Sequence, residues 1–545
     1  MLSFTLTKRV GILSPLIQSL VVGIHLDRWR RYHREKKTAF VFGLAGSLTT
    51  PIVIADETRN NDEQLWQVIE EQQARIESLE ESMKASDSSQ ADDNASVRSG
   101  ARDFHIGGYG SIRAETNNLD ADQDTFTFRR IVLTGDGKIN DRLEAYFELE
   151  FERFGEIELE KSASAGADGF SAGQAIEGTN GSEISMEQAW ARYRVNDSVN
   201  LDMGALLVPL GRFNINHDDN QWNLTRRTLV DRGAPVLPTK AAWPELGLGF
   251  SGLVETQAGL VDYRLYAVNG VNLDFAFEGE VAAEPNGSST VGVSKFEAEF
   301  APSRGGFSND LNGNKAITGR LALLPQSGQE LAISGYYGRY TPDFMDSESV
   351  WSVALDGLHS LGGFEIEYEV VHTDWGNIDD VAASFASAAI DKEVEAKVGA
   401  EGGETTEIVS EITLGGLAES RTGYWIEARY PFWPEALDNT FLGRGFSNPS
   451  LEPTVRMEQV VIRNRVTGIE FSNRQVTELD KEESSIVNRA TVGLAYRPVP
   501  DWVISFATEY TWTDEQTLAG LTNFIPAGEN ENSVLAFSTG VAYTF

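Results

Sequence analysis

Apolar and polar side chains alternate residue by residue in many short stretches between residues 103 and 545. In 143–152, and again in 364–370, every second residue is apolar and most of the residues between are glutamate. Successive side chains of a β-strand point to opposite faces, so this period of two predicts strands with one apolar and one acidic face. The acidic face of the first stretch carries Glu144, Glu148 and Glu150.

The connections between these stretches alternate in length. Residues 497–501 and 361–363 form tight turns, whereas 155–183, 270–315 and 376–406 are long and rich in Gly, Ala, Ser and Glu. A soluble sandwich shows the same alternation of side chains. Short turns at one rim and long loops at the other are instead typical of an outer-membrane barrel.

The last predicted strand ends in aromatic residues. Its apolar face consists of Leu535, Phe537, Thr539, Val541, Tyr543 and Phe545. This ending resembles the C-terminal insertion signal of outer-membrane barrels, carried here by Tyr543 and Phe545. It implies the barrel-assembly machinery as a partner.

Residues 103–545 are long enough for about 16, or 18, lipid-spanning strands around a water-filled lumen. The predicted fold class is therefore all-β, a transmembrane antiparallel β-barrel preceded by a short N-terminal coiled-coil helix. Aromatic residues near predicted strand ends suggest girdles at the membrane interfaces. They are Trp351, Trp375, Tyr424, Trp425, Trp433, Trp502, Tyr510 and Trp512.

Residues 1–55 read as a leader with a secretory signal peptide. Three basic residues, Arg34, Lys36 and Lys37, precede the apolar run 38–46, and small residues follow. This order is typical of a secretory signal. Either the signal is extended or the true start lies about 30 residues downstream. Both alternatives predict a mature chain beginning near Asp56.

Residues 56–84 are predicted to form a periplasmic coiled-coil segment, because apolar residues repeat there with a 4-3 spacing. The alternative is a single amphipathic helix lying on the barrel or on peptidoglycan. Residues 85–102 are polar and read as a flexible linker. The coiled-coil seam consists of Leu65, Ile69, Gln72, Ile76, Leu79 and Met83.

Composition narrows the possible functions. A net charge of −37 argues against nucleic acid as a partner, because phosphates would be repelled. The chain has no cysteine, so thiolate catalysis and cysteine metal sites are absent. The histidines lack metal-ligand spacing such as H-E-x-x-H. We therefore expect no enzyme activity, no cofactor and no metal.

Basic residues are densest in the barrel sequence just after Pro209. We expect this segment to fold toward the pore, facing Glu144, Glu148 and Glu150, where opposed charges would select solutes at a constriction. The alternative is that its arginines pair locally with Asp218, Asp219 and Asp231 in an outer loop. The constriction candidates are Arg212, His217, Arg226, Arg227, Arg232 and Lys240.

Several motifs resemble those of the phosphate-selective porin O and P family. The resemblance implies a 16-stranded trimeric porin with an inward-folded loop that narrows the pore. The family's dense Arg/Lys ladders are not matched in this acidic chain, so its phosphate preference does not carry over. The motifs are Phe126-Thr-Phe-Arg-Arg-Ile-Val-Leu-Thr-Gly135, Gln188-Ala-Trp-Ala-Arg-Tyr193, Gly204-Ala-Leu-Leu-Val-Pro-Leu-Gly211 and Tyr424-Trp-Ile-Glu-Ala-Arg-Tyr-Pro-Phe-Trp433.

The expected function is a water-filled channel for passive diffusion of small hydrophilic, charged solutes. Its expected place is the outer membrane of a Gram-negative cell, surrounded by lipid and lipopolysaccharide, as a homotrimer with the coiled coil in the periplasm. An alternative is a structural barrel that anchors the envelope through its helical stalk.

Overall fold

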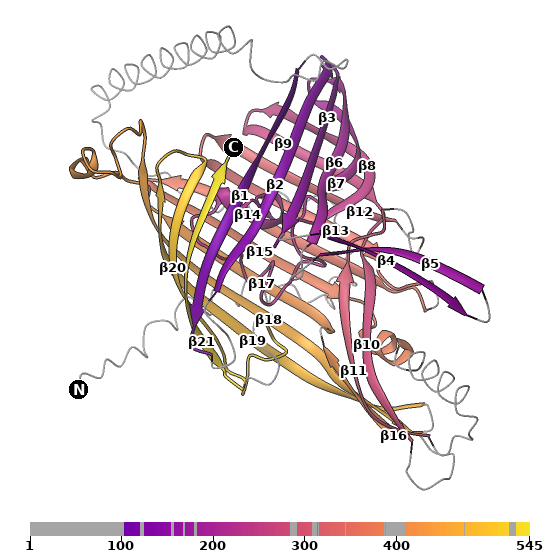
Figure 1. Cartoon of the computed structure of the whole chain (residues 1–545). Coiled ribbons are helices and arrows are strands. Elements are labelled where there is room, and N and C mark those ends of the chain that lie inside the picture. Colours follow the sequence, from indigo (N-terminus) through magenta and orange to yellow (C-terminus); the bar gives the residue numbers. More distant parts are fainter. Residues whose placement is uncertain are drawn as a thin grey trace, which may run out of the picture. The chain divides into compact units, whose positions relative to one another are not determined.

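Sixteen antiparallel strands form a closed ring in a computed structural model of the chain (Figure 1). The structure describes residues 103–545 apart from 120–124, 154–156, 167–168, 179–182, 284–290, 308–312, 314, 344, 386, 388–408, 416, 473–474 and 523–529. The predicted barrel of about 16 strands is thus confirmed, while the leader, the coiled-coil seam and the linker lie outside the described residues.

The ring follows the chain order of its members, and each strand pairs with its two neighbours. Its strands are β1 (Asp103–Asn117), β2 (Thr125–Asn140), β3 (Leu143–Glu152), β6 (Glu183–Asn196), β7 (Val199–Leu207), β8 (Pro244–Thr256), β9 (Gly259–Val268), β12 (Ala316–Gln326), β13 (Gln329–Arg339), β14 (Ser349–Leu361), β15 (Phe364–Trp375), β17 (Ala418–Arg429), β18 (Ser450–Ser472), β19 (Gln475–Arg497), β20 (Trp502–Thr513) and β21 (Ser533–Thr544).

The pairing of the first and last strands closes the ring. β1 and β21 run antiparallel, from the pair Tyr109–Thr544 to the pair Asn117–Ala536. Beyond β21, the Phe545 N–H donates to the Gly108 carbonyl, and the Gly108 N–H donates to the Phe545 carbonyl. Closure removes the free edges that an open sheet would expose to lipid.

Two of the segments expected as long loops contain further strands. β4 (Ile157–Gly166) and β5 (Gly169–Gly178) form a separate hairpin between β3 and β6. β10 (Asn272–Ala283) and β11 (Val291–Ser303) form a second hairpin, and β16 (Val409–Gly415) links β11 to β18. Among the described residues, no helix is both long and apolar enough to cross a membrane.

The tight turns lie where the sequence predicts them. β14 ends at Leu361 and β15 begins at Phe364, with Gly362 and Gly363 between them at φ values of 58° and 88°. Two consecutive residues with positive φ make the type of two-residue turn whose twist suits a hairpin, and glycine adopts it without steric cost. The turn between β19 and β20 likewise spans residues 498–501.

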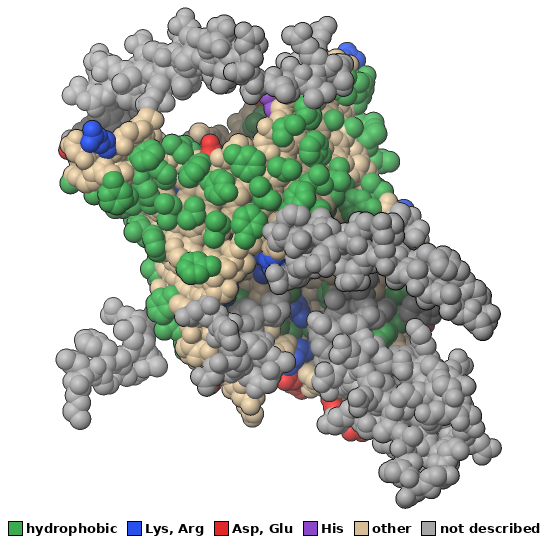
Figure 2. All heavy atoms as spheres, viewed as in Figure 1, with side chains coloured by type: hydrophobic (Ala, Val, Ile, Leu, Met, Phe, Trp, Pro, Cys, Tyr) green, Lys and Arg blue, Asp and Glu red, His purple; other side chains and the backbone are tan. Residues whose placement is uncertain are grey.

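The two faces of the strands differ in polarity as the alternation requires. On β3, Glu148 and Glu150 are buried at 2% and 9% exposure and point into the ring. On β21, Leu535 and Phe537 are exposed and point outward. Figure 2 shows such apolar side chains as a broad band over the outer face of the strands. An outward apolar band and an inward polar face are the pattern of a barrel in lipid.

We predict that a charge within this outer band destabilises the barrel. Phe506, on β20, is 55% exposed on the outer face, and Phe506→Arg should cost about 2–4 kcal/mol in vesicles if the side chain lies near the bilayer midplane. Reversible guanidinium unfolding from lipid vesicles measures the change.

The matched control is Phe441→Arg in the connection between β17 and β18. Phe441 is 87% exposed and lies outside the strands, so its replacement should change the free energy of unfolding by about 0–1 kcal/mol. Equal destabilisation by both variants would contradict the assignment of the outer band to lipid.

Candidate pore-constriction site

Residues 208–243, between β7 and β8, form a segment that lies inside the ring, here called the inner segment. It contains one helical turn, α4 (Arg212–Ile215), and a short 3-10 helix, η3 (Asp219–Gln221). Much of it is buried, including Leu210, Leu229 and Trp243 at 0% exposure. This is the basic segment that the sequence analysis expected to fold toward the pore, and its role at a constriction stays a prediction.

Side chains from strands around the ring bind the backbone of the inner segment. The Gly211 N–H donates to Ser334 Oγ on β13 at 3.0 Å, and the Phe213 N–H donates to Glu369 Oε2 on β15 at 2.9 Å. At the other end, Asn220 Nδ2 donates to Thr544 Oγ1 on β21 at 3.0 Å. The segment therefore crosses the lumen from one wall to another.

β18 and β19 hold the middle of the inner segment. The Leu229 N–H donates to Glu458 Oε1 at 2.8 Å, and Arg456 Nη2 donates to the Arg226 carbonyl at 2.8 Å. Glu458 also accepts ion pairs from Arg456 Nε at 3.2 Å and from Arg489 Nε at 2.6 Å. Because carboxylate and guanidinium groups supply these bonds, the buried backbone has partners that a strand ladder would otherwise provide.

The predicted arginines divide between wall contacts and local contacts. Arg212 pairs with Glu367 and, at 3.1 Å, with Glu330, both on the barrel wall. Arg226 Nε lies 2.6 Å from Glu115 Oε1 and 3.0 Å from Glu509 Oε2, also on the wall.

The other two arginines pair with Asp231 within the segment, although the segment is not the outer loop of the alternative hypothesis. Arg227 Nη1 lies 3.0 Å from Asp231 Oδ2, and Arg232 Nε lies 3.7 Å from the same oxygen. Lys240 is exposed. The predicted basic residues thus differ in their surroundings: Arg212 and Arg226 pair with the barrel wall, whereas Lys240 is exposed.

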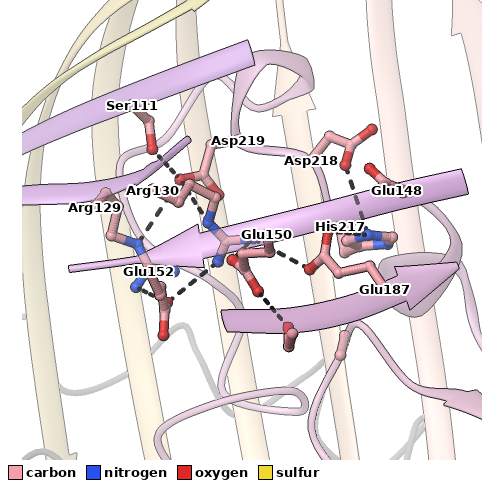
Figure 3. A network of polar contacts seen from close by, with 12 residues as sticks. Ser111, Arg129, Arg130, Glu148, Glu150, Glu152, Glu187, His217, Asp218 and Asp219 are labelled. Carbon is pink, nitrogen blue, oxygen red and sulfur yellow. Dashed lines mark hydrogen bonds and ion pairs between the residues drawn. The ribbon is translucent and has the colours of Figure 1, made fainter. Parts of the chain in front are cut away.

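The predicted acidic face is brought to the inner segment in part. Glu148 and Glu150 lie beneath it, whereas Glu144 pairs with Arg194 Nη2 at 2.9 Å near the opposite end of β3. His217 lies over the first two, with Nε2 3.6 Å from Glu187 Oε2 on β6. Figure 3 shows the carboxylates and His217 facing one another across the strands and the segment.

Three charged residues of this network, Arg129, Arg130 and Glu187, were missed at the level of sequence, and each lies at a β-bulge. Ser111 pairs with Arg130 and Ile112 with Phe128, so Arg129 is the extra residue on β2. A bulge breaks the strict alternation of faces and re-aims side chains. Arg129 and Arg130 therefore both point inward, with side chains 14% and 0% exposed.

Glu187 occupies the second bulge. Glu148 pairs with Gln188 and Leu149 with Met186, which leaves Glu187 as the extra residue on β6. Its side chain is 1% exposed and lies 3.6 Å from Arg130 Nη1. On β2, the adjacent residues Arg129 and Arg130 interrupt the alternation of apolar and polar side chains. This interruption is the sequence signal that would have found them.

The charged neighbours in this network shift the pKa values of two residues of the inner segment, Asp219 and His217. Burial disfavours the charged form of Asp219, but Arg130 and Arg129 outweigh burial and hold its pKa below its usual range. Burial also lowers the pKa of His217, but Glu187, Asp218 and Glu148 outweigh it and raise that pKa to about 9.

A cavity of about 160 Å³ lies between the inner segment and the wall formed by β15, β17 and β18. Its lining mixes charged and aromatic side chains. Trp425 lines it and donates to Glu369 Oε2 at 3.1 Å, while Trp375 is also buried. The prediction that these two tryptophans belong to an outer girdle is wrong, because their strand positions point inward. The charged lining residues are Arg212, Glu367, Glu427, Arg429 and Arg456.

We predict that Glu458 is required to keep the inner segment in place. Glu458→Ala leaves Arg456 and Arg489 buried without their carboxylate, a change that costs about 3–5 kcal/mol for buried pairs. Trypsin should then cut after Arg226 and Arg227 much faster than in the wild-type protein, as mass spectrometry of timed digests would show.

Glu144→Ala is the matched control, since Glu144 pairs with a half-exposed Arg194 and does not contact the segment. Its digest should follow that of the wild type. Equal cleavage of the two variants would show that β18 and β19 do not hold the segment.

Known proteins are similar to parts of this chain. The model of the phosphate-selective porin O and P family matches residues 97–321. An uncharacterized protein of Aquifex aeolicus (strain VF5) is 24% identical over 295 residues, which cover 53% of this chain and 56% of that relative's length. The chain thus spans little more than half of this relative.

Solved porins and channels are similar at low identity. An anion-selective porin from Comamonas acidovorans is 11% identical with a TM-score of 0.43, over 81% of this chain and 99% of that one. The channel DcaP of Acinetobacter baumannii is 9% identical with a TM-score of 0.40, over 81% and 97%. Over residues 97–321, the chain is therefore similar to the phosphate-selective porin O and P family.

Proposed function

We propose that this protein is a passive outer-membrane channel for small hydrophilic, mainly charged solutes. The observation that carries the proposal is the inner segment, which crosses the lumen of the ring and borders a charged cavity. A 16-stranded barrel has an aqueous lumen, and a segment bound across it sets the narrowest cross-section. Solutes would move by electrodiffusion, without an energy source.

Arg212, Arg429 and Arg456 are the cations that supply selectivity in this proposal. All three line the cavity, together with Glu367 and Glu427. The Arg429 side chain is 20% exposed, so it meets water in the lumen. Opposed charges across a narrow, low-dielectric passage create a transverse field that acts on charged and dipolar solutes.

The other predicted constriction residues have lesser roles in this proposal. Arg226, Arg227 and Arg232 do not line the cavity; Arg226 pairs with two wall glutamates, and the other two pair with Asp231. Lys240 adds an exposed cation on the inner segment. His217 lies on the acidic side of the lumen, next to Glu148 and Glu150.

We predict stepwise ion conductance from purified protein in planar bilayers. Arg212→Gln with Arg429→Gln should shift the zero-current potential in a salt gradient toward cation selectivity, because Glu367 then lacks its cations. Coulomb's law in water gives about 0.5 kcal/mol for a unit charge at about 8 Å, or roughly a twofold change in permeability ratio per charge.

Arg194→Gln is the control, because Arg194 pairs with Glu144 away from the cavity. It should leave the potential unchanged. Absence of stepwise conductance would overturn the channel, and an unchanged potential in the double variant would remove Arg212 and Arg429 from its selectivity.

The proposed assembly is a homotrimer in lipid and lipopolysaccharide, secreted by the signal in residues 1–55 and inserted through its C-terminal strand by the barrel-assembly machinery. Residues 56–84 would join three chains in the periplasm through their seam. We predict that deleting residues 62–84 preserves conductance, because the charged lumen lies entirely within the barrel.

The same deletion tests the alternative function as an envelope anchor. Outer-membrane blebbing, counted by electron microscopy in cells that produce the deleted chain, should match that in cells with the full chain. Increased blebbing with unchanged conductance would favour the anchor, and loss of conductance would show that the stalk supports the channel.

A further inference from the structure

His217 has the burial and the hydrogen bond that are usual for a histidine that binds a metal ion. Its Nδ1 lies 2.9 Å from the backbone carbonyl of Asn214, in the same inner segment, and its ring is 2% exposed. A ring nitrogen that donates to a backbone carbonyl fixes the tautomer and leaves Nε2 as a ligand atom, which is the usual arrangement in metal sites. Nε2 has no hydrogen-bond partner in the structure.

Three carboxylates face this nitrogen from three parts of the fold. Glu148 comes from β3, Glu187 from the bulge on β6, and Asp218 from the inner segment. One ligand atom from each of these residues and from His217 can be chosen so that all four lie within 4.8 Å of one another. Figure 3 shows the four side chains converging.

The spacing is close to that of ligands around one ion. His217 Nε2 lies 3.6 Å from Glu187 Oε2 and 3.6 Å from Asp218 Oδ1. These separations are too long for hydrogen bonds. Ligands about 2.0–2.2 Å from a tetrahedral metal ion lie roughly 3.3–3.6 Å apart, so an ion fits between them with little movement.

The negative charges of these three carboxylates are only partly balanced by lysine and arginine side chains. Among the described residues, no lysine or arginine forms an ion pair with Glu148 or Asp218. Glu187 lies 3.6 Å from Arg130, but Arg130 also faces Glu150, Glu152 and Asp219.

Among the residues that the structure describes, neither Glu187 side-chain oxygen has a hydrogen-bond partner, although that side chain is 1% exposed. Buried carboxylates without hydrogen-bond donors are costly, and a divalent cation would compensate them.

Hydrogen bonds from outside the group orient Glu148. Gln188 Nε2 donates to Glu148 Oε2 at 2.8 Å, and the Tyr146 hydroxyl lies 3.3 Å from the same oxygen. Such contacts hold ligating carboxylates in metal sites. Asp218 has a side chain 26% exposed, so an ion could enter from the lumen on that side.

We propose that His217, Glu148, Glu187 and Asp218 bind a divalent transition-metal cation of the zinc type within the lumen. One imidazole and three carboxylates form a mixed set that suits first-row metals better than Mg²⁺ or Ca²⁺, which prefer oxygen alone. The bound ion would join β3 and β6 to the inner segment. The sequence-based expectation of no metal site relied on spacing along the chain, whereas these ligands meet only in the fold.

The test uses the full chain, purified in detergent, stripped with a chelator and dialysed. Zn²⁺ binding is measured by calorimetry and elemental analysis, and Co²⁺ absorption reports the ligand field. We expect one Zn²⁺ per chain, and His217→Gln and Glu148→Gln should each weaken binding at least about tenfold. Circular dichroism and heat-dependent gel mobility confirm that each variant retains its barrel.

Two matched controls accompany these variants. His359→Gln removes a histidine that contacts Gln329 and Tyr368, and Glu144→Gln removes a glutamate of β3 that pairs with Arg194. Both should bind Zn²⁺ as the wild-type protein does.

Three results would overturn the site. They are no stoichiometric Zn²⁺ in the wild type, equal affinity in His217→Gln and His359→Gln, and Mg²⁺ or Ca²⁺ binding as tight as that of Zn²⁺. Because binding is measured in detergent, a chain that binds Zn²⁺ but conducts no ions rejects the proposed channel and leaves the site standing.

Discussion

A backbone in lipid must find its hydrogen-bond partners within the protein, and the rest of this structure depends on the pairing of β1 with β21 that meets this demand. Without that pair, the sheet would have two open edges. With it, the sheet has an outside that contacts lipid and an inside that is polar. The alternation of side chains, the alternation of turn lengths and the charged lumen are all consequences of one closed ring.

The buried backbone of the inner segment also needs hydrogen-bond partners, and it finds them on side chains of the barrel wall. It is not a strand, so its amides and carbonyls bond to wall side chains such as Glu369, Glu458 and Arg456. Burying those side chains requires counter-charges, which the lumen supplies as ion pairs. Many acidic and basic residues of the barrel therefore support the fold of the segment, and Arg456 both binds the segment and lines the cavity.

Much of the fold could be predicted from the sequence, because a period of two depends on local geometry alone. The faces of β3 and β15 and the turn at Gly362 follow directly from it. The strands within the long loops were not predicted, since their pairing depends on partners far along the chain. The leader and the coiled-coil seam remain predictions.

The site was predicted less fully, for a physical reason. The inward fold of the basic segment was anticipated, but bulges at Arg129 and Glu187 shift side chains from the face that alternation assigns to them. A bulge is defined by the register of two strands, and a single strand's sequence does not specify it. Trp425 was misplaced because an aromatic residue near a strand end suits a lipid interface and a lumen equally well.

The contacts of the inner segment with β13, β15, β18 and β21 also have a mechanical consequence. A barrel wall is a single layer of strands, and a ring of that thickness flattens into an ellipse more easily than it stretches. A strut fixed to several points of the wall resists that flattening. The barrel of this protein is thus stiffened by the element that crosses its lumen.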